Sequence, residues 1–400
     1  MLDRRPRIAL LLNLQWPYKR HTGVFAGTQR YAQEQGWESI IDEYAAENLA
    51  QDRPGKARYD GVIARANSRL ADRAERLGVP VVNVWLTSPV WRRLPGVFPD
   101  FVASGRLRAE HLLARGLRRF AIMEREDRGA KTEATAFRER VSEAGFECMG
   151  VKLPLDPTRT YAAQVRSERK IEQWMERWEP PIGVFVSGDT MGRLVAQMAQ
   201  RRGYRVPQDV AIIAGANEEA ICEHPRPSLT SIEFGHDRIG YEAARMLDQL
   251  MASKDKRRGA ARVAPTRLFL PPLGVVVRES TDFVAVDDVL VADALAYIAA
   301  NCHRRMGQAD VARAVSTESR TLQRRFQKVL GRPIAATIRQ ARLERAKREL
   351  VQSERPLDQI ARSAGFSHAM RMYDVFRREL GISPSDYRKQ RRQVVGKRAT

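Results

Sequence analysis

The chain has 400 residues, of which 43% are apolar and 29% are charged, and its formal net charge is +21. This composition excludes a disordered chain and a single small domain, and it predicts two or three packed domains. So basic a chain favours a polyanionic partner such as nucleic acid. No apolar run approaches the roughly 18 residues of a transmembrane helix, so we expect no membrane partner.

Residues 1–281 alternate short apolar runs with stretches of helical periodicity. Continuous β-branched strands separated by helices are typical of parallel sheets covered on both faces. Two such series in succession predict a two-lobed α/β domain. The expected strands are 7–13, 60–65, 79–85, 119–124, 182–188 and 209–217, and the expected helices are 23–36, 70–78, 103–116, 133–145, 170–178, 190–203 and 237–251.

Polar and aromatic residues follow these strands, at the sheet edge where open α/β sheets bind ligands. Sugar sites use carboxylate, guanidinium and amide groups for hydroxyls and an aromatic ring for the sugar face. We therefore expect a small polar effector, with a sugar as the leading candidate, although each residue alone can equally be a satisfied surface or hinge residue. The candidates are Trp16, Tyr18, Arg65, Asp100, Glu124, Asp189 and Asn217.

The pattern changes to helices alone after a linker that we predict at 282–288. Residues 289–400 hold 24 Lys and Arg against 10 Asp and Glu, so they carry +14 of the net charge. This region is therefore the expected polyanion-binding domain. Its expected helices are 289–302, 308–315, 319–331, 333–351 and 357–365, with two more inside 365–389.

This basic region contains an internal repeat. Phe326, Leu330 and Gly331 recur fifty positions later as Phe376, Leu380 and Gly381. Each copy has a short helix, a tight turn and a second helix, which is the helix-turn-helix pattern. Both glycines suit the left-handed end of a helix.

The two copies, and above all the closing GFSHAMRMYDVFRRELGISPSDYR, resemble the DNA-binding domain of the AraC family. The resemblance implies that the second helix of each copy enters the major groove of double-stranded DNA. Residues that face base edges in this register are Arg320, Gln323 and Arg324 in the first copy and Ala369, Met370, Arg371 and Asp374 in the second. Residues placed to contact phosphates are Arg325, Lys328, Arg377, Arg378, Arg388 and Lys389.

The α/β part resembles the periplasmic-binding-protein-like sensor of LacI/GalR regulators, through segments such as AEHLLARGLRRFAIME and PQDVAIIAGANEE. No DNA-binding headpiece is expected before the first strand. A sensor of this kind joined to a C-terminal AraC-type domain resembles the regulators of xylose operons. Glu133 and Ala216 stand where that family usually has Arg and Asp, so we expect another polar effector to bind better than xylose.

Other features argue against catalysis and secretion. The sequence has no GxSxG, HExxH, Walker or GxGxxG motif, and its six histidines have no metal spacing, so we expect no enzyme, cofactor or metal. Three scattered cysteines and no signal peptide predict a cytoplasmic protein. A homodimer is expected, and RNA polymerase is a further candidate partner. Two alternatives stay open: a regulator with a non-sugar effector or none, and a solute-binding protein for transport.

Overall fold

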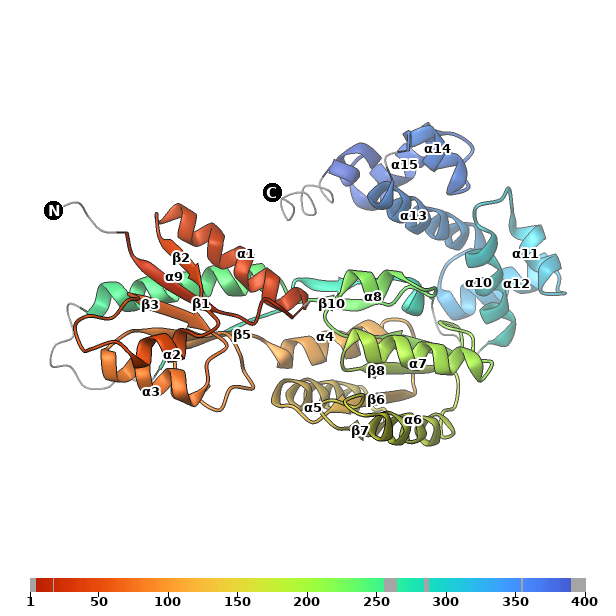
Figure 1. The fold of residues 1–400 in the computed structure, drawn as a ribbon. Coiled ribbons are helices and arrows are strands. Elements are labelled where there is room, and N and C mark those ends of the chain that lie inside the picture. The colour runs from red at the N-terminus through yellow and green to blue at the C-terminus, as the bar shows by residue number, and fades with distance from the viewer. Residues whose placement is uncertain (1–4, 17, 255–264, 284–287, 354, 390–400) are drawn as a thin grey trace. The chain divides into compact units, whose positions relative to one another are not determined.

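The computed structural model describes residues 5–16, 18–254, 265–283, 288–353 and 355–389. The chain forms two compact units, Met1–Asp282 and Phe283–Thr400, which we describe separately (Figure 1). Residues 284–287 of the expected linker lie outside the described part of the chain. No helix within the described ranges is long and apolar enough to cross a membrane.

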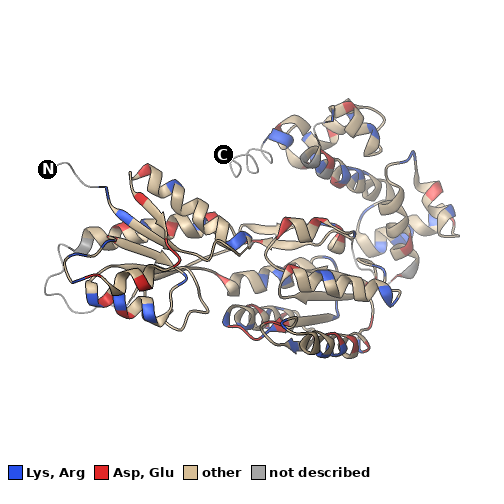
Figure 2. Cartoon of the chain, in the orientation of Figure 1, with Lys and Arg blue, Asp and Glu red and all other residues tan. Residues whose placement is uncertain are grey.

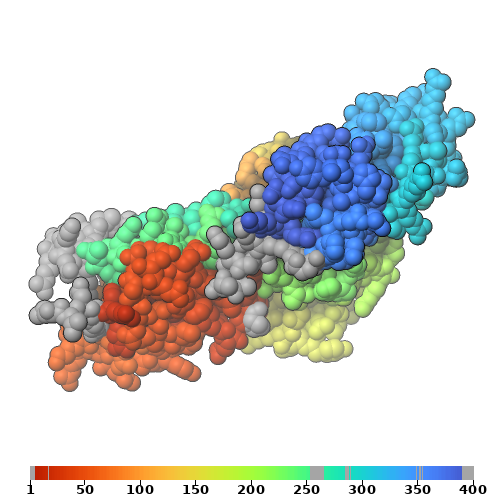
Figure 3. All heavy atoms as spheres, turned by 90° about the horizontal axis from the view of Figure 1, so that it is seen from above, coloured from red at the N-terminus to blue at the C-terminus, as the bar shows by residue number. Residues whose placement is uncertain are grey.

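The first lobe of the N-terminal unit is a parallel sheet in the order β11-β5-β4-β3-β1-β2. Alternate residues of β1 face opposite helix layers: Ile8 packs against α1 and α9, whereas Ala9 packs against α2 and α3. The space-filling view shows the green atoms of α9 beside the red atoms of α1 (Figure 3). This lobe contains β1 (Arg7–Leu11), β2 (Glu38–Ile41), β3 (Gly61–Ala64), β4 (Val81–Asn83), β5 (Gly96–Pro99) and β11 (Arg267–Leu270), with α1 (Lys19–Glu34), α2 (Ala45–Ala50), α3 (Ser68–Leu77) and α9 (His236–Lys254).

The second lobe repeats this topology with a parallel sheet in the order β7-β6-β8-β9. Phe120, Phe137 and Phe185 pack on the side of α4 and α5, while Met123 and Trp174 belong to the core under α6 and α7. Its elements are β6 (Phe120–Arg125), β7 (Cys148–Leu153), β8 (Ile182–Val186) and β9 (Val210–Ile213), with α4 (Phe101–Leu113), α5 (Arg128–Glu143), α6 (Tyr161–Met175), α7 (Asp189–Arg201) and α8 (Glu219–Glu223).

The chain crosses between the lobes after β5, after β10 (Ser231–Glu233) and between β11 and β12 (Gly274–Val276). β10 and β12 pair antiparallel, and Phe101 packs against Phe234 with ring centroids 5.6 Å apart. The unit ends in the short helix η1 (Glu279–Thr281), which the second lobe holds in place. The Ser280 hydroxyl donates to the Ile212 carbonyl at 2.6 Å, and His111 Nε2 lies 2.8 Å from Thr281 Oγ1.

The second unit is all-helical within its described residues and has two small hydrophobic cores. Helix α13 joins them, because Ile334 and Ile338 pack in one core while Leu343 and Leu350 pack in the other. The fold class predicted from the sequence is confirmed: a two-lobed α/β unit is followed by a helical unit with two helix-turn-helix motifs. The helices are α10 (Val289–Asn301), α11 (Gln308–Ala314), α12 (Ser319–Leu330), α13 (Ile334–Gln352), α14 (Leu357–Ser363) and α15 (Ala369–Leu380).

The two helix-turn-helix motifs match in detail. α12 and α15 each have 12 residues and start fifty positions apart. They end at Gly331 and Gly381 with φ of 65° and 72°, a backbone conformation that residues with a side chain adopt only at a cost. Ser383 caps the helical residues that follow, since its Oγ accepts from the Asp386 backbone N–H at 3.1 Å.

Candidate functional site: an interlobe cleft and a DNA interface

The first lobe has its topological switch point between β1 and β3, where strand order reverses and ligands bind in this architecture. Arg65 follows β3, and its guanidinium carbon lies 4.8 Å above the Trp85 ring. The Asn13 amide is oriented so that its nitrogen donates to Glu43 and its oxygen accepts from Arg65 Nη1 at 2.8 Å. Arg65 is therefore fixed by residues from the ends of the two strands that flank β3, which are β1 and β4.

An aromatic cluster follows β1 at the same edge. Trp16 and Tyr18 are 47% and 41% exposed, and their ring centroids are 6.0 Å apart. Both rings contact His21, which is buried and lies 2.9 Å from the Asn13 carbonyl oxygen through Nδ1. Burial lowers the His21 pKa to about 4, so the ring is neutral near pH 7.

The second lobe has its switch point between β6 and β8. The strand pleat places the adjacent charged residues Glu124 and Arg125, at the end of β6, on opposite faces of the sheet. Glu124 is buried and pairs with Arg138 of α5 at 3.2 Å and with Lys152 of β7 at 3.7 Å. Arg125 lies on the opposite face of β6, toward Arg20 of the first lobe. Burial lowers the Arg20 pKa most, and the nearby Arg125 charge lowers it as well. The structure thus does not bring Glu124 together with the other candidates, and Arg125 is a cleft residue that we did not predict.

Asp189 and Asn217 lie together at the ends of β8 and β9, and their polar atoms form hydrogen bonds with other residues of the chain. Asp189 accepts from the backbone N–H groups of Ala216 and Glu218 at 3.0 and 2.9 Å and from the Ser231 hydroxyl at 2.9 Å. The Asn217 amide donates to Glu233 at 2.9 Å and accepts from Arg278 at 2.7 Å. Both side chains shape the loop after β9.

Asp100 lies at the crossing from β5 to α4. Its carboxylate caps α4 by accepting from the Ala103 N–H at 2.9 Å, and its own N–H donates to the Leu270 carbonyl at 2.8 Å. Asp100 therefore connects the crossing after β5 to the crossing between β11 and β12, because Leu270 is the last residue of β11. This position favours a hinge role for a residue that we predicted to bind the effector.

Contacts from α1 link the two lobes directly. The Lys19 backbone N–H donates to the Glu218 carboxylate at 3.0 Å, and Lys19 Nζ pairs with Glu233 at 2.7 Å and Glu219 at 3.0 Å. Burial raises the pKa of Glu218. Local sequence patterns cannot predict these contacts, because they join residues about 200 positions apart.

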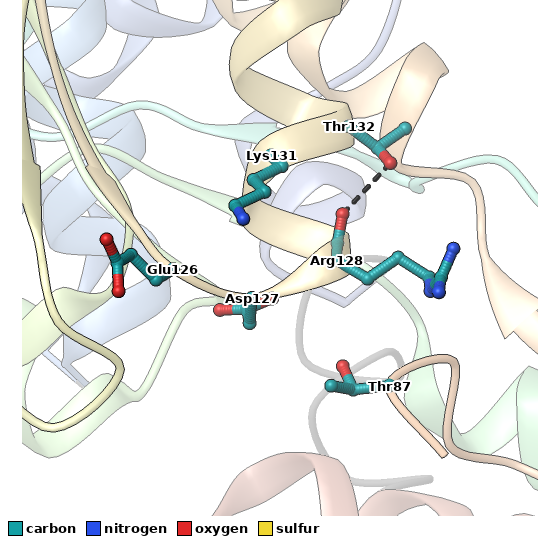
Figure 4. A pocket seen from close by; sticks show the side chains of 6 residues that line it. All are labelled: Thr87, Glu126, Asp127, Arg128, Lys131 and Thr132. Atoms are coloured by element: carbon teal, nitrogen blue, oxygen red, sulfur yellow. Dashed lines mark hydrogen bonds between the residues drawn. The ribbon is translucent and has the colours of Figure 1, made fainter. Parts of the chain in front are cut away.

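A cavity of about 470 Å³ opens between the lobes (Figure 4). Thr87 comes from the first lobe, and the other lining residues surround the start of α5. Arg128 also spans the lobes, with its guanidinium carbon 4.6 Å above the Trp91 ring. The cavity is lined by Thr87, Glu126, Asp127, Arg128, Lys131 and Thr132.

The first recognition helix, α12, presents a cationic stripe. Arg320, Arg324 and Lys328 are spaced four residues apart and exposed, and none of them has a carboxylate partner in the described part of the chain. Gln323 is partly buried, and its Oε1 accepts weakly from the Ile334 N–H at 3.4 Å. Arg325 pairs with Asp288 at 2.8 Å.

The second recognition helix, α15, is different in charge. Met370 is 64% exposed, Arg371 and Asp374 are exposed, and Ala369 is half-buried. Tyr373 is 38% exposed and stands fifty positions after Gln323, so the repeat itself could have nominated it.

The predicted phosphate contacts near α15 fall into two groups. Arg377, Arg378 and Lys389 are exposed. Figure 2 shows Lys and Arg positions in blue along the helices of this unit. Arg388 is half-buried, and its Nη2 donates to the Arg355 carbonyl at 2.8 Å, which holds the side chain against the domain.

The two units together define a ligand-responsive, DNA-binding transcription regulator. Residues 109–281 match the family model of a periplasmic binding protein-like domain, and residues 311–390 match that of a helix-turn-helix domain. Within the described residues no group of three or more His, Cys, Asp or Glu could hold a metal ion.

The relatives that match along nearly the whole chain include regulators of xylose operons. The chain is 26% identical to the xylose operon regulatory protein of Escherichia coli K12, over 99% of this chain and 100% of the relative. It is 25% identical to that of Haemophilus influenzae, over 97% and 99%. Among solved structures, the xylose-binding transcription activator xylR matches with a TM-score of 0.68 and 25% identity over 97% of this chain and 99% of that one. The chain is thus similar to xylose operon regulators over its whole length, with an AraC-type domain after a LacI/GalR-type sensor.

Proposed function

We propose that this protein binds specific DNA sites and regulates genes of carbohydrate catabolism in response to a sugar or sugar derivative bound between the sensor lobes. The main support is the convergence of both switch points on one cleft, with Trp16, Tyr18 and Arg65 from one lobe and Arg125 from the other. Similarity to the xylose operon regulators along the whole chain supports the sugar class. We assign Asp100, Asp189 and Asn217 to hinge and loop positioning.

Signal transfer would run through the end of the sensor. The helix η1 is anchored to the second lobe through Ser280 and through the contact of Thr281 with His111. The chain continues from η1 toward the DNA-binding unit. A ligand that binds the closed lobes better would increase the population of the closed sensor, and η1 would transmit this change to the DNA-binding unit.

The proposal includes assembly and location. We infer a homodimer, because a two-fold pair of DNA-binding units matches paired operator half-sites. We place the protein in the cytoplasm with its DNA, and we regard RNA polymerase as a candidate contact. The proposed action is binding, with no catalytic step.

The test uses the full chain and DNA fragments from upstream of its own and neighbouring genes. Fluorescence anisotropy measures DNA affinity with and without pentoses, hexoses, polyols and sugar acids. Because binding is linked, an effector must change DNA affinity by the factor by which DNA changes effector affinity. A protein that binds these compounds without any change in DNA affinity would favour the solute-binding alternative. DNA binding with no response to any compound would favour an effector-independent regulator.

A further inference from the structure

Three arginines at the cleft have guanidinium groups with few partners. Arg20 Nε lies 3.2 Å from His21 Nε2, and its Cζ lies 4.6 Å above the Tyr18 ring. Arg125 reaches Asp127 only at 3.9 Å, and its Nε is buried without a hydrogen-bond partner among the described residues. Arg65 is held by the Trp85 ring and the Asn13 amide, neither of which carries a charge.

These arginines come from both lobes and lie near one another. Asn13 connects two of them, since its side-chain oxygen accepts from Arg65 while its carbonyl lies 2.9 Å from the His21 ring that contacts Arg20. Burial and, to a lesser degree, the Arg20 charge lower the Arg65 pKa to about 10. Burial and the Arg125 charge also lower the Arg20 pKa. The Arg20 side chain is still exposed to solvent, as expected for a residue in the wall of an open cleft. The cluster is therefore electrostatically unfavourable when the cleft is empty.

Carboxylates near the cluster already have other bonds. Glu43 accepts from the backbone N–H groups of Asn13 and Leu14 at 3.0 and 3.1 Å. Glu218 accepts from the Lys19 N–H, and Asp127 caps α5 by accepting from the Ala130 N–H at 2.9 Å. Their charges partly offset the lowering of the Arg20 and Arg65 pKa values. Among the described residues, however, none of these carboxylates accepts a hydrogen bond from a guanidinium of the cluster.

A second orphan group lies at the same switch point. The hydroxyl of Ser187, which is 4% exposed and follows β8, has no hydrogen-bond partner in the described part of the chain. Residue 188 is a glycine whose added Cβ would lie 3.9 Å from the Arg125 guanidinium carbon. Buried polar groups normally find partners, so this edge is suited to a ligand that brings several acceptor oxygens.

Aromatic rings border the arginines on the first lobe. Trp16 and Tyr18 are about half exposed, and Trp85 lies under Arg65. Such rings offer flat apolar surfaces to the C–H face of a sugar. Arginine binds carboxylate and phosphate groups through two parallel hydrogen bonds, which neutral hydroxyls cannot match in strength.

We propose that the effector is an anionic sugar derivative, a sugar acid or sugar phosphate, whose charged group is bound by Arg20, Arg65 and Arg125. This inference rests on the proposed sugar-responsive function and narrows it. The shared chemistry is a polyhydroxy chain or ring that carries a carboxylate or phosphate. The row of Trp16, Tyr18 and Trp85 would face the apolar side of that ligand.

The test is calorimetric titration of the full chain with probes that differ in the anionic group. The probes are xylose with xylonate, glucose with gluconate and glucose 6-phosphate, ribose with ribose 5-phosphate, and inorganic phosphate alone. At least one anionic probe should bind about tenfold or more tightly than its neutral partner, because charge-assisted bonds are the stronger ones. The carboxylate and phosphate members separate the two sources of charge.

Variants then locate the binding group. Arg20→Gln, Arg65→Gln and Arg125→Gln should each weaken the anionic probe by about tenfold to a hundredfold and should leave neutral sugars little changed. Arg119→Gln is the matched control, since Arg119 is exposed and pairs with Glu179 at 3.2 Å away from the cleft. Circular dichroism of each variant confirms that it folds.

Three results would overturn the inference in different ways. A neutral sugar that binds more tightly than every anionic probe, and that is unaffected by the three substitutions, would refute the anionic class alone. Binding of none of the probes would refute the sugar-responsive function as well. Binding of inorganic phosphate as tightly as any sugar derivative would refute the proposal of an anionic sugar derivative, because the sugar part would then contribute nothing to affinity.

Discussion

Arg108 and Glu133 form an ion pair inside the second lobe, with 2.9 Å between Nε and Oε1 and side-chain exposures of 1% and 7%. The Arg108 guanidinium also donates to the carbonyls of Ala214 and Gly215, and Glu133 accepts from the Ser104 hydroxyl. Glu133 therefore connects α5 to α4 and, through Arg108, to the loop after β9. At the position where the family resemblance led us to expect an arginine, this chain has an acid with a partner in the core.

Removing Glu133 should destabilise the sensor strongly. Glu133→Ala leaves a buried guanidinium without its carboxylate, and we expect the free energy of unfolding to fall by about 3–5 kcal/mol. Chemical denaturation followed by circular dichroism measures this change. Glu143→Ala is the matched control on the same two helices, because its pair with Arg106 is exposed and its loss should have little effect. If Glu133→Ala instead abolished effector binding at unchanged stability, Glu133 would be a ligand-binding residue.

Acid should destabilise the sensor through buried histidines. Burial lowers the pKa of His111 from 6.5 to about 3. Protons therefore bind preferentially to the unfolded chain, and stability present above pH 6.5 is lost as the pH falls toward 3. At about pH 5.5 the loss from this one group is about 1 kcal/mol, since one pKa unit corresponds to about 1.4 kcal/mol.

The measurement compares the free energy of unfolding at about pH 7.5 and about pH 5.5. His111→Gln should reduce the difference, and His224→Gln, at an exposed loop position, should leave it unchanged. The pKa values of His21 and His236 are both lowered to about 4, so part of the pH dependence should persist in the His111 variant. An unchanged pH dependence in that variant would show that His111 is protonated or exposed in the folded protein.

Periodicity and the internal repeat predict most of the fold. The alternation of apolar runs and helical stretches identifies both lobes, and the fifty-residue repeat of Phe326 and Phe376 identifies both DNA-binding motifs. Short or exposed elements escape this reasoning. β2 (Glu38–Ile41) has no fully buried residue, and β5 (Gly96–Pro99) begins with Gly and ends with Pro, which are rare inside strands.

The candidate site is predicted less completely, because strand ends identify a position but not the direction of a side chain. Glu124 and Arg125 are adjacent in sequence, yet only Arg125 turns toward the first lobe. Asp189 has the expected position, but the hydroxyl that occupies it comes from Ser231, 42 residues later. Contacts of this range depend on tertiary structure, and neither periodicity nor local propensity contains them.

Asp189 should support the effector site through the loop after β9. Asp189→Ala removes the acceptor for two backbone N–H groups and for Ser231, so we expect the free energy of unfolding of the sensor to fall by about 2–4 kcal/mol. Thermal stabilisation by the effector should be lost, while DNA binding by the full chain without effector should remain. Asp189→Asn keeps the shape and one acceptor oxygen, so its effect should be smaller. Full effector binding by the Ala variant would exclude any role of this loop.

The two recognition helices should contribute unequally to DNA binding. Arg324 and Asp374 occupy equivalent positions of α12 and α15, and both are exposed. Arg324→Ala should cost about 1–3 kcal/mol at the cognate site and relax the preference at one base pair, because Arg reads guanine through two hydrogen bonds. Asp374→Ala should raise affinity for random DNA, since a negative charge near the phosphates is removed. Anisotropy titrations with cognate and random duplexes at several salt concentrations measure both effects.

Lys328→Ala and Arg313→Ala complete this comparison. Lys328 lies on the same stripe as Arg324, one turn further along α12, and a phosphate contact there predicts equal weakening of all duplexes and a salt slope smaller by about one. Arg313 is 80% exposed on α11 and pairs with Asp310, so its removal should change affinity little. If Arg324→Ala weakened cognate and random DNA equally, Arg324 would contact the backbone instead of a base. If Asp374→Ala relaxed the preference at one base pair of the second half-site, that carboxylate would read a cytosine amino group, and the second helix would specify sequence through an acid where the first uses arginine.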